Sequence, residues 1–269
     1  MTDGFQIVVC GSLVPDPIQT LEPVPGGDRP ALKNEAMLPS VLDPWAGHAL
    51  YEAAHLAART PGSKVWLVSL GPKAQLQQLM MRVAQKVPFE LVALDGSASG
   101  FTDSFEVAAA LAAAIEAIDG LDRSRLLLFG GCASASRDAG VTVQMVGERL
   151  GIHDQFFGVD ELKVQDDGSI RVLERVEGGR YLASVCEGAP LVAAWATGSL
   201  PEPPNSPQVG MQNMRTIMPA LAKAKPVPLG GEGTTWLGAE VPQQRRETRV
   251  VKDSSADEIA REIVTWIKG

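Results

Sequence analysis

Short apolar runs alternate with helix-forming stretches through the first half of this sequence, and this alternation restricts the possible folds more than any other feature. Short runs of this kind are typical of strands buried on both faces of a parallel sheet. We expect strands at Phe5–Cys10, Lys64–Leu70, Phe89–Leu94 and Leu126–Phe129, and helices at Ala46–Arg59, Ala74–Val83, Ser104–Ala117 and Ala139–Leu150. The pattern predicts a doubly wound α/β fold, mostly parallel and Rossmann-like, whose ligands bind beyond the carboxyl ends of its strands.

The pattern changes after Phe156, where short strands follow one another with tight turns between them. These strands are expected at Gly158–Gln165, Ile170–Arg175, Tyr181–Val185 and Leu191–Ala194. We expect them to be antiparallel additions to one edge of the sheet. A loop rich in Pro and Met is then predicted over residues 201–228, and a Gly-rich link follows it.

An amphipathic helix is predicted at Ala256–Lys268, capped near Ser254 or Ser255. The sequence therefore predicts an α/β domain over residues 1–229, and a linker with a C-terminal helical arm over residues 230–269. Ile259, Ile263 and Ile267 form an apolar stripe on this helix, with Trp266 beside it. Such a stripe favours packing against a partner.

Composition excludes several classes of protein. A net charge of −8 and an isoelectric point near 5.0 argue against nucleic acid as the main ligand. No apolar run approaches the roughly 20 residues that cross a membrane, and no basic signal region is recognisable at the start, so we expect a cytoplasmic protein. The cysteines Cys10, Cys132 and Cys186 lie far apart without paired spacing and are expected to be free thiols.

The segment from Leu126 to Ile152 carries the clearest indication of a ligand. An apolar strand runs into a turn of small residues, and a helix is expected to begin near Ala139 with Asp138 as its N-cap. Unpaired N–H groups and the positive end of the helix dipole suit a phosphate at such a point. The segment has no P-loop lysine and no nucleophile beside a histidine, so we predict a nucleotide held by the backbone. No catalytic residue and no metal cluster are predicted.

Six segments, in the same order and at similar spacing, together resemble the β subunit of electron-transfer flavoproteins. They are VVCGSLVPDP (Val8–Pro17), LDPWAGHALYEAAHLA (Leu42–Ala57), VSLGP (Val68–Pro72), GCASASRDAGVTVQMVGERLG (Gly131–Gly151), EGGRYLASVCEGAPLVAAWATGSLPEP (Glu177–Pro203) and MPALAKAKPVP (Met218–Pro228). The chain departs from the family pattern where Asp43 and Trp45 replace Asn and Phe. It also departs in the acidic box, which is reduced to Ser136–Val141, and in the basic run, of which Lys223 and Lys225 remain.

The resemblance implies an electron carrier without substrate chemistry of its own. Such a β subunit pairs with an α subunit that holds most of an FAD site, and it binds AMP as a structural nucleotide. The heterodimer takes electrons from a primary flavin-dependent dehydrogenase and passes them to a quinone reductase. The resemblance leaves open the donor dehydrogenase, its substrate and the direction of electron flow.

The resemblance also assigns roles to single residues. Cys10, Gly11, Asp43 and Leu70 would surround the adenine and ribose, and Asp138, Ala139, Gly140, Val141 and Thr142 would receive the phosphate. Trp45 would contact the edge of the flavin. The plainer alternatives are that Asp138 is only an N-cap, that Gly140 only permits tight packing, and that Trp45 staples its helix. Whether Arg137 reaches the phosphate stays open.

Partner docking is assigned to Met218, Pro219 and Leu221 in the predicted recognition loop. Methionine suits an anchor that adapts to a partner surface. The alternative is a loop folded onto the core, with methionine filling gaps.

Two other functions remain compatible with the residues. The first is a nucleotide-binding sensor or regulatory domain without a redox role, and the second is an electron-bifurcating relative with FAD in this subunit. A nucleotide-activating ligase is excluded, because its SGGxDS loop is absent after the first strand, where the chain reads CGSLVPD.

Overall fold

The computed structural model describes residues 4–27, 29–98, 100–136, 140–231, 233–242, 248 and 250–268. It divides into two units, Met1–Ala239 and Glu240–Gly269. Beyond residue 229, where the sequence places the start of the linker, Gly230 and Thr234 form hydrogen bonds with the carboxylates of Glu106 and Asp103.

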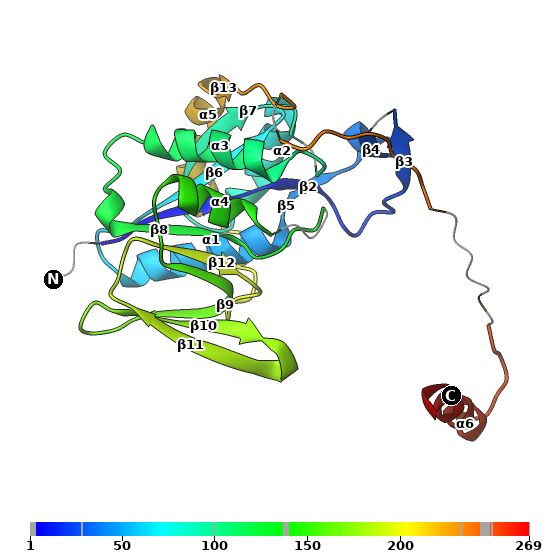
Figure 1. Ribbon diagram of the computed structural model, residues 1–269. Helices are drawn as coiled ribbons and strands as arrows, with labels where there is room; N and C mark the ends of the chain where they lie inside the picture. Colours follow the sequence, from blue (N-terminus) through cyan, green and yellow to red (C-terminus); the bar gives the residue numbers. More distant parts are fainter. Residues whose placement is uncertain are drawn as a thin grey trace. The chain divides into compact units, whose positions relative to one another are not determined.

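The first unit contains a nine-stranded sheet in the order β11-β10-β9-β12-β8-β1-β6-β7-β13 (Figure 1). Its strands are β1 Gln6–Cys10, β6 Lys64–Gly71, β7 Glu90–Asp95, β8 Leu126–Gly131, β9 Gln155–Val164, β10 Ile170–Val176, β11 Arg180–Cys186, β12 Leu191–Trp195 and β13 Lys225–Pro226. Two small antiparallel pairs stand apart from it: β2 Leu13–Pro15 with β5 Ser40–Leu42, and β3 Pro23–Gly26 with β4 Arg29–Leu32. The helices of this unit are α1 Pro44–Arg59, α2 Lys73–Val83, α3 Ser104–Glu116, α4 Thr142–Arg149 and α5 Pro207–Ala222.

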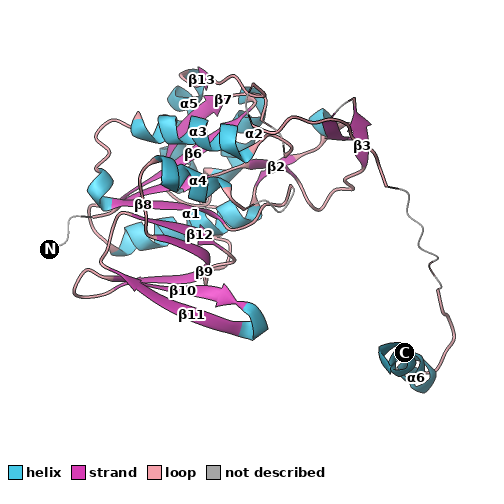
Figure 2. Ribbon diagram, viewed as in Figure 1, coloured by secondary structure: helices cyan, strands magenta, loops and turns pink. Residues whose placement is uncertain are grey.

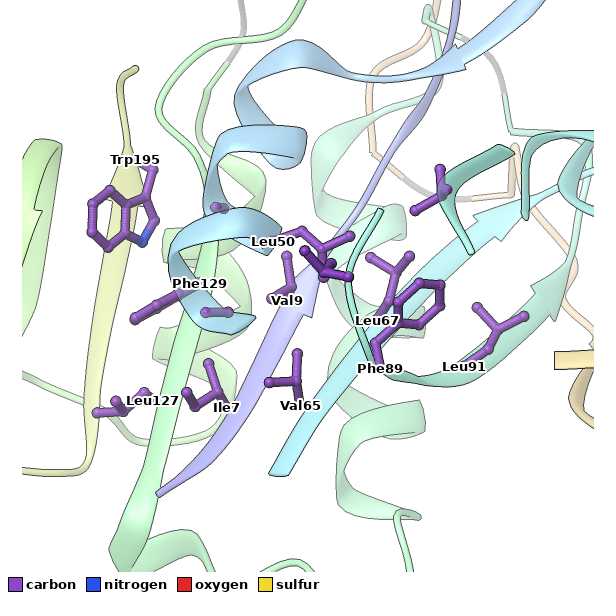
Figure 3. Packing of buried hydrophobic residues seen from close by; sticks show 14 of the residues in the cluster. Ile7, Val9, Leu50, Val65, Leu67, Phe89, Leu91, Leu127, Phe129 and Trp195 are labelled. Atoms are coloured by element: carbon purple, nitrogen blue, oxygen red, sulfur yellow. The ribbon is translucent and has the colours of Figure 1, made fainter. Parts of the chain in front are cut away.

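Helices cover both faces of the parallel centre, as the alternating pattern predicted. Strand β1 pairs in parallel with β6 on one side and β8 on the other, and all five of its residues are buried. On one face, Leu50 of α1 packs over Val9 and Leu67 (Figure 3). On the other face, Val8 and Leu128 meet α3 and α4. The predicted doubly wound α/β fold is confirmed.

Strands β9, β10 and β11 form the predicted antiparallel extension at one edge (Figure 2). Strand β12 does not belong to it, and its predicted antiparallel edge position is wrong. It lies between β9 and β8 and pairs in parallel with both. The physical reason is visible in LVAAW, where all five residues are buried, because a strand covered on both faces is apolar throughout and does not alternate.

The predicted loop over residues 201–228 is largely a helix, α5. Its N-cap is Ser206, whose hydroxyl accepts from the Val209 N–H, and Pro207 occupies the first helical position. Asn213, Ile217 and Leu221 recur every four residues and are buried. The side-chain amide of Asn213 donates to the carbonyls of Ala84 and Val87 at 2.8 and 2.7 Å, which ties α5 to the end of α2.

The second unit contains helix α6, Ala256–Lys268, with the bounds predicted from the sequence. Its start is a capping box: the Glu258 N–H donates to the Ser255 hydroxyl oxygen, and the Ser255 N–H donates to the Glu258 carboxylate at 2.9 Å. None of the helix residues is buried. Among the described residues, no helix combines the length and apolar character that crossing a membrane requires.

Candidate functional site

A cleft opens beyond the carboxyl ends of β1, β6 and β8, where ligands of doubly wound folds bind. It encloses about 870 Å³, counted out to its open mouth. Its lining residues come from the strand ends and the turns after them: Cys10, Gly11, Ser12, Leu13, Val14, Asp43, Ala46, Leu70, Ala98, Gly100, Thr102, Ser104, Val107, Leu111, Gly130, Gly131, Ala133, Ser134, Ser136, Gly140, Thr142 and Val143. A lining of apolar side chains with a few polar groups among them is typical of a small-molecule site.

Six residues that the sequence assigned to nucleotide binding meet in this cleft. They are Cys10, Gly11, Asp43, Leu70, Gly140 and Thr142. Val141 is described at the N-cap of α4 and does not line the cleft. Asp138 and Ala139 lie outside the described residues, as does Arg137.

Helix α4 begins at Thr142, three positions later than the sequence predicted. Its N-cap is Val141, whose side chain makes no capping hydrogen bond. The first N–H groups of a helix have no acceptor within the helix, so the start of α4 presents donors beside the cleft. The predicted arrangement of strand, small-residue turn and helix N-terminus is therefore present, with a longer turn than expected.

Glycine at position 140 is required by the packing of this turn. A Cβ at Gly140 would lie 1.7 Å from the carbonyl oxygen of Cys132, and real Cβ atoms do not approach backbone this closely. A Cβ at Gly131 would likewise lie 2.6 Å from Cβ of Trp45. Gly140 therefore packs directly against the backbone of Cys132, and Gly131 packs against Trp45 on the first turn of α1.

Asp43 connects the start of α1 to the turn after β8. Its Oδ1 accepts from the Trp45 N–H at 3.1 Å, which makes it the N-cap of α1. Its Oδ2 accepts from the Ser134 hydroxyl at 2.7 Å and from the Ala135 N–H at 3.0 Å. Burial raises the pKa of this carboxyl, and the hydrogen bonds from Ser134, Ala135 and Trp45 oppose that rise.

Cys10 ends strand β1 at the floor of the cleft. Burial raises the pKa of its thiol to about 12, so the thiol stays protonated at neutral pH and is not a nucleophile. Next to it, the Ser69 hydroxyl donates to the Gly11 carbonyl at 2.7 Å and fixes the backbone where β1 leaves the sheet. Cys10 therefore serves as a small apolar wall of the cleft.

Sequence reasoning missed the hydroxyl groups of the cleft. Besides Thr142, the lining contains Ser12, Thr102, Ser104, Ser134 and Ser136. The available signal was the run of small and hydroxyl residues Ser134-Ala135-Ser136 directly after a predicted strand, where ligands of this fold bind. Among the described lining residues, Asp43 is the one charged side chain, so the cleft is hydroxyl-rich and carries no cation from those residues.

The remaining predicted residues lie outside the cleft. Trp45 is half-buried on the first turn of α1. Met218 and Pro219 lie on α5, where the Met218 side chain is 44% exposed. Leu221 is 3% exposed and belongs to the hydrophobic core, so its assignment to partner docking is corrected: the four-residue spacing from Ile217 places it on the buried face of α5.

No group of three or more metal-ligating side chains occurs within the part of the chain that the structure describes. A doubly wound sheet with one hydroxyl-rich cleft at its strand ends defines an α/β protein with a small-molecule site. The sequence profile of the Electron transfer flavoprotein domain matches residues 34–225, well over half of the chain. The chain belongs to the electron transfer flavoprotein family. The match does not distinguish the α from the β subunit, and a search of curated proteins finds no match.

Proposed function

We propose that this chain is the β subunit of a heterodimeric electron transfer flavoprotein and holds AMP as a structural nucleotide. One observation carries the proposal: six residues assigned to nucleotide binding, drawn from four separate segments, line a single cleft at the strand ends. The six β-subunit-like segments of the sequence support the choice of subunit.

The cleft favours a ligand of modest charge. Leu70 and the Cys10 thiol provide an apolar wall for a planar base, and the start of α4 with Thr142 provides donors for a phosphate. A phosphate monoester needs fewer compensating charges than a di- or triphosphate, whose binding sites use lysine, arginine or a metal ion. The start of α4 and Thr142 offer donors for one phosphate group, and this fits a nucleoside monophosphate.

FAD would be held mainly by the α subunit and would supply the group that accepts and donates electrons. This chain would contribute Trp45 at the flavin edge. The fit rests on the position of Trp45: it is half-buried on the first turn of α1, where the Asp43 carboxylate holds its backbone N–H. An aromatic side chain fixed at a helix start and still partly exposed can pack against a ring system of a partner.

The partner contacts follow from the exposed apolar surfaces. Met211 and Met218 are exposed on α5, while Ile217 and Leu221 of the same helix are buried, so the outer face of α5 is available to a primary dehydrogenase. Helix α6 would pack on the α subunit through its apolar stripe. A quinone reductase would be the acceptor, and the complex would act in the cytoplasm.

Co-expression with the α subunit encoded by a neighbouring gene tests the proposal. The purified complex should show a flavin spectrum, and denaturation should release one FAD and one AMP per heterodimer. Release of two FAD and no AMP would identify a bifurcating relative instead. A stable monomer that binds a nucleotide and no flavin would identify a nucleotide sensor and overturn the proposal.

A further inference from the structure

The segment after β13 touches the outer side of a cleft wall. We define the strap as residues 229–231 and 233–236, and the cleft wall as residues 96–98 and 100–104. We propose that the strap is a positioning element that holds the cleft wall in its ligand-binding shape. The nucleotide part of this proposal rests on the function proposed above.

Residues of the cleft wall line two cavities. Ala98, Gly100, Thr102 and Ser104 line the nucleotide cleft. Ser97, Phe101, Thr102 and Asp103 line a second cavity together with Arg29 of β4 and with Leu229, Gly230, Thr234 and Trp236 of the strap. Thr102 lines both cavities. A shift of the strap is therefore expected to displace residues that also line the nucleotide cleft.

Hydrogen bonds fasten the strap to the start of α3. The Thr234 N–H donates to Asp103 Oδ2 at 2.8 Å, and the Thr234 hydroxyl donates to the same oxygen. The Gly230 N–H donates to both carboxylate oxygens of Glu106, at 2.8 and 3.1 Å. Asp103 also caps α3 by accepting from the Phe105 N–H at 2.7 Å. The strap therefore binds the residue that fixes where the cleft wall ends and α3 begins.

The path of the chain places this contact at the base of the arm. β13 pairs with β7, and the Val227 N–H donates to the Asp95 carbonyl at 2.7 Å. From there the strap runs toward the β3–β4 hairpin (Figure 1), where the Cβ position of Gly230 lies 3.7 Å from the Arg29 guanidinium. The first unit ends at Ala239, soon after the strap.

Two glycines of the strap provide a matched pair of variants. At Gly233 the φ angle is +84°, and a Cβ would lie 2.7 Å from Cγ of Asp103, so an alanine there must push the strap away from the cleft wall. At Gly231 a Cβ would meet nothing within 4 Å. Gly233→Ala tests the contact, and Gly231→Ala controls for the loss of a glycine in the same segment.

The experiment measures AMP binding by calorimetry on the full chain, and amide hydrogen exchange with and without AMP. Gly233→Ala should weaken AMP binding by about fivefold or more, the lower end of typical coupling between sites, and Gly231→Ala should not. In the wild type, saturating AMP should slow exchange at the Gly230 and Thr234 amides, because coupling is reciprocal. Thr234→Val, with Thr235→Val as control, repeats the test if Gly233→Ala does not fold.

Equal AMP affinity in Gly233→Ala, Thr234→Val and the wild type would overturn the coupling, as would unchanged exchange at Gly230 and Thr234. Failure of the proposed function has a different signature, which is a wild-type chain that binds no AMP at all. In that case, the contact between the strap and the cleft wall is tested without a ligand. Gly233→Ala should raise exchange over residues 100–106 relative to Gly231→Ala, and unchanged exchange there would show that the strap does not hold the wall.

Discussion

Ser134 donates its hydroxyl to Oδ2 of Asp43 at 2.7 Å, across 91 positions of sequence. The Asp43 residue is 1% exposed, and its other carboxylate oxygen caps helix α1. One buried carboxylate therefore fixes the start of a helix and the turn after β8 at the same time. The shape of the cleft depends on these two contacts of Asp43, since Asp43 and Ser134 both line the cleft.

Removal of the Asp43 carboxylate should destabilise the folded chain. Asp43→Ala removes a helix cap and leaves the Ser134 hydroxyl and the Ala135 N–H without their acceptor. We expect the free energy of unfolding to fall by roughly 2–4 kcal/mol in urea titrations, with weaker AMP binding. The control is Asp122→Ala at the half-exposed cap of a short 3-10 helix, which should lower stability less than Asp43→Ala and leave AMP binding unchanged. Equal effects of the two variants would contradict the role of Asp43.

The raised pKa of Asp43 predicts a pH dependence with a defined sign. Burial raises the folded-state pKa above the usual value of 3.8, so between that value and the raised pKa the folded chain binds more protons than the unfolded chain. The contribution of Asp43 to stability therefore falls as pH rises through this window. Asp43→Asn removes the titration, so the stability of the wild type relative to this variant should decrease as pH rises from about 4, and it should level off above the raised pKa. A stability difference that grows with pH would show that the hydrogen bonds lower the pKa of Asp43 by more than burial raises it.

Gly140 should tolerate no side chain. Gly140→Ala brings a Cβ against the Cys132 carbonyl, so the turn must open, and overpacking of this kind costs roughly 1–3 kcal/mol or more. AMP should be lost from the purified complex. Thr142→Val removes one hydroxyl and keeps the volume, so it should weaken AMP binding with little change in the melting temperature. Normal folding and AMP content of Gly140→Ala would show that the turn adapts.

The parallel centre of the fold could be predicted because each buried strand and each amphipathic helix carries its own local pattern. Strand β12 was misplaced since a short apolar run shows that it is buried and does not show which strands flank it. Helix α5 was taken for a loop because Pro and Met dominated its composition, although Asn213, Ile217 and Leu221 repeat with a helical period.

The site was predictable in part for a related reason. Cys10 and Leu70 end predicted strands and Thr142 lies in the first turn of a predicted helix, so the topology brings them together. The link between Asp43 and Ser134 joins two turns whose approach depends on the packing of Gly131 against Trp45, and no local pattern records that contact. The strap was likewise unpredictable, because the hydrogen bonds of Gly230 and Thr234 involve carboxylates more than 120 positions away.

Substitutions at Met218 and Leu221 of α5 should distinguish an effect on partner docking from an effect on folding. Met218→Ala removes a half-exposed side chain and should raise the apparent KM for the donor dehydrogenase, at a cost in association of roughly 1–3 kcal/mol. The melting temperature should stay close to that of the wild type. Leu221→Ala should instead destabilise the chain by roughly 2–5 kcal/mol, because it leaves a cavity in the core. If Met218→Ala lowers stability and leaves the donor kinetics unchanged, the docking assignment is wrong.

The arm should be required for assembly and dispensable for folding of the first unit. Helix α6 leaves Trp266 72% and Ile267 79% exposed, and Ile259 and Ile263 lie on the same stripe. Truncation after Ala239 should weaken α-subunit binding by at least tenfold, about 1.4 kcal/mol, in a calorimetric titration. The melting temperature should not change. Within the intact helix, Trp266→Ala should weaken binding in the same direction, because a large aromatic side chain is a frequent interface anchor. Thr265→Ala, on the opposite side of the helix, should have no effect. A truncated chain that binds the α subunit with unchanged affinity would show that the apolar stripe serves another partner.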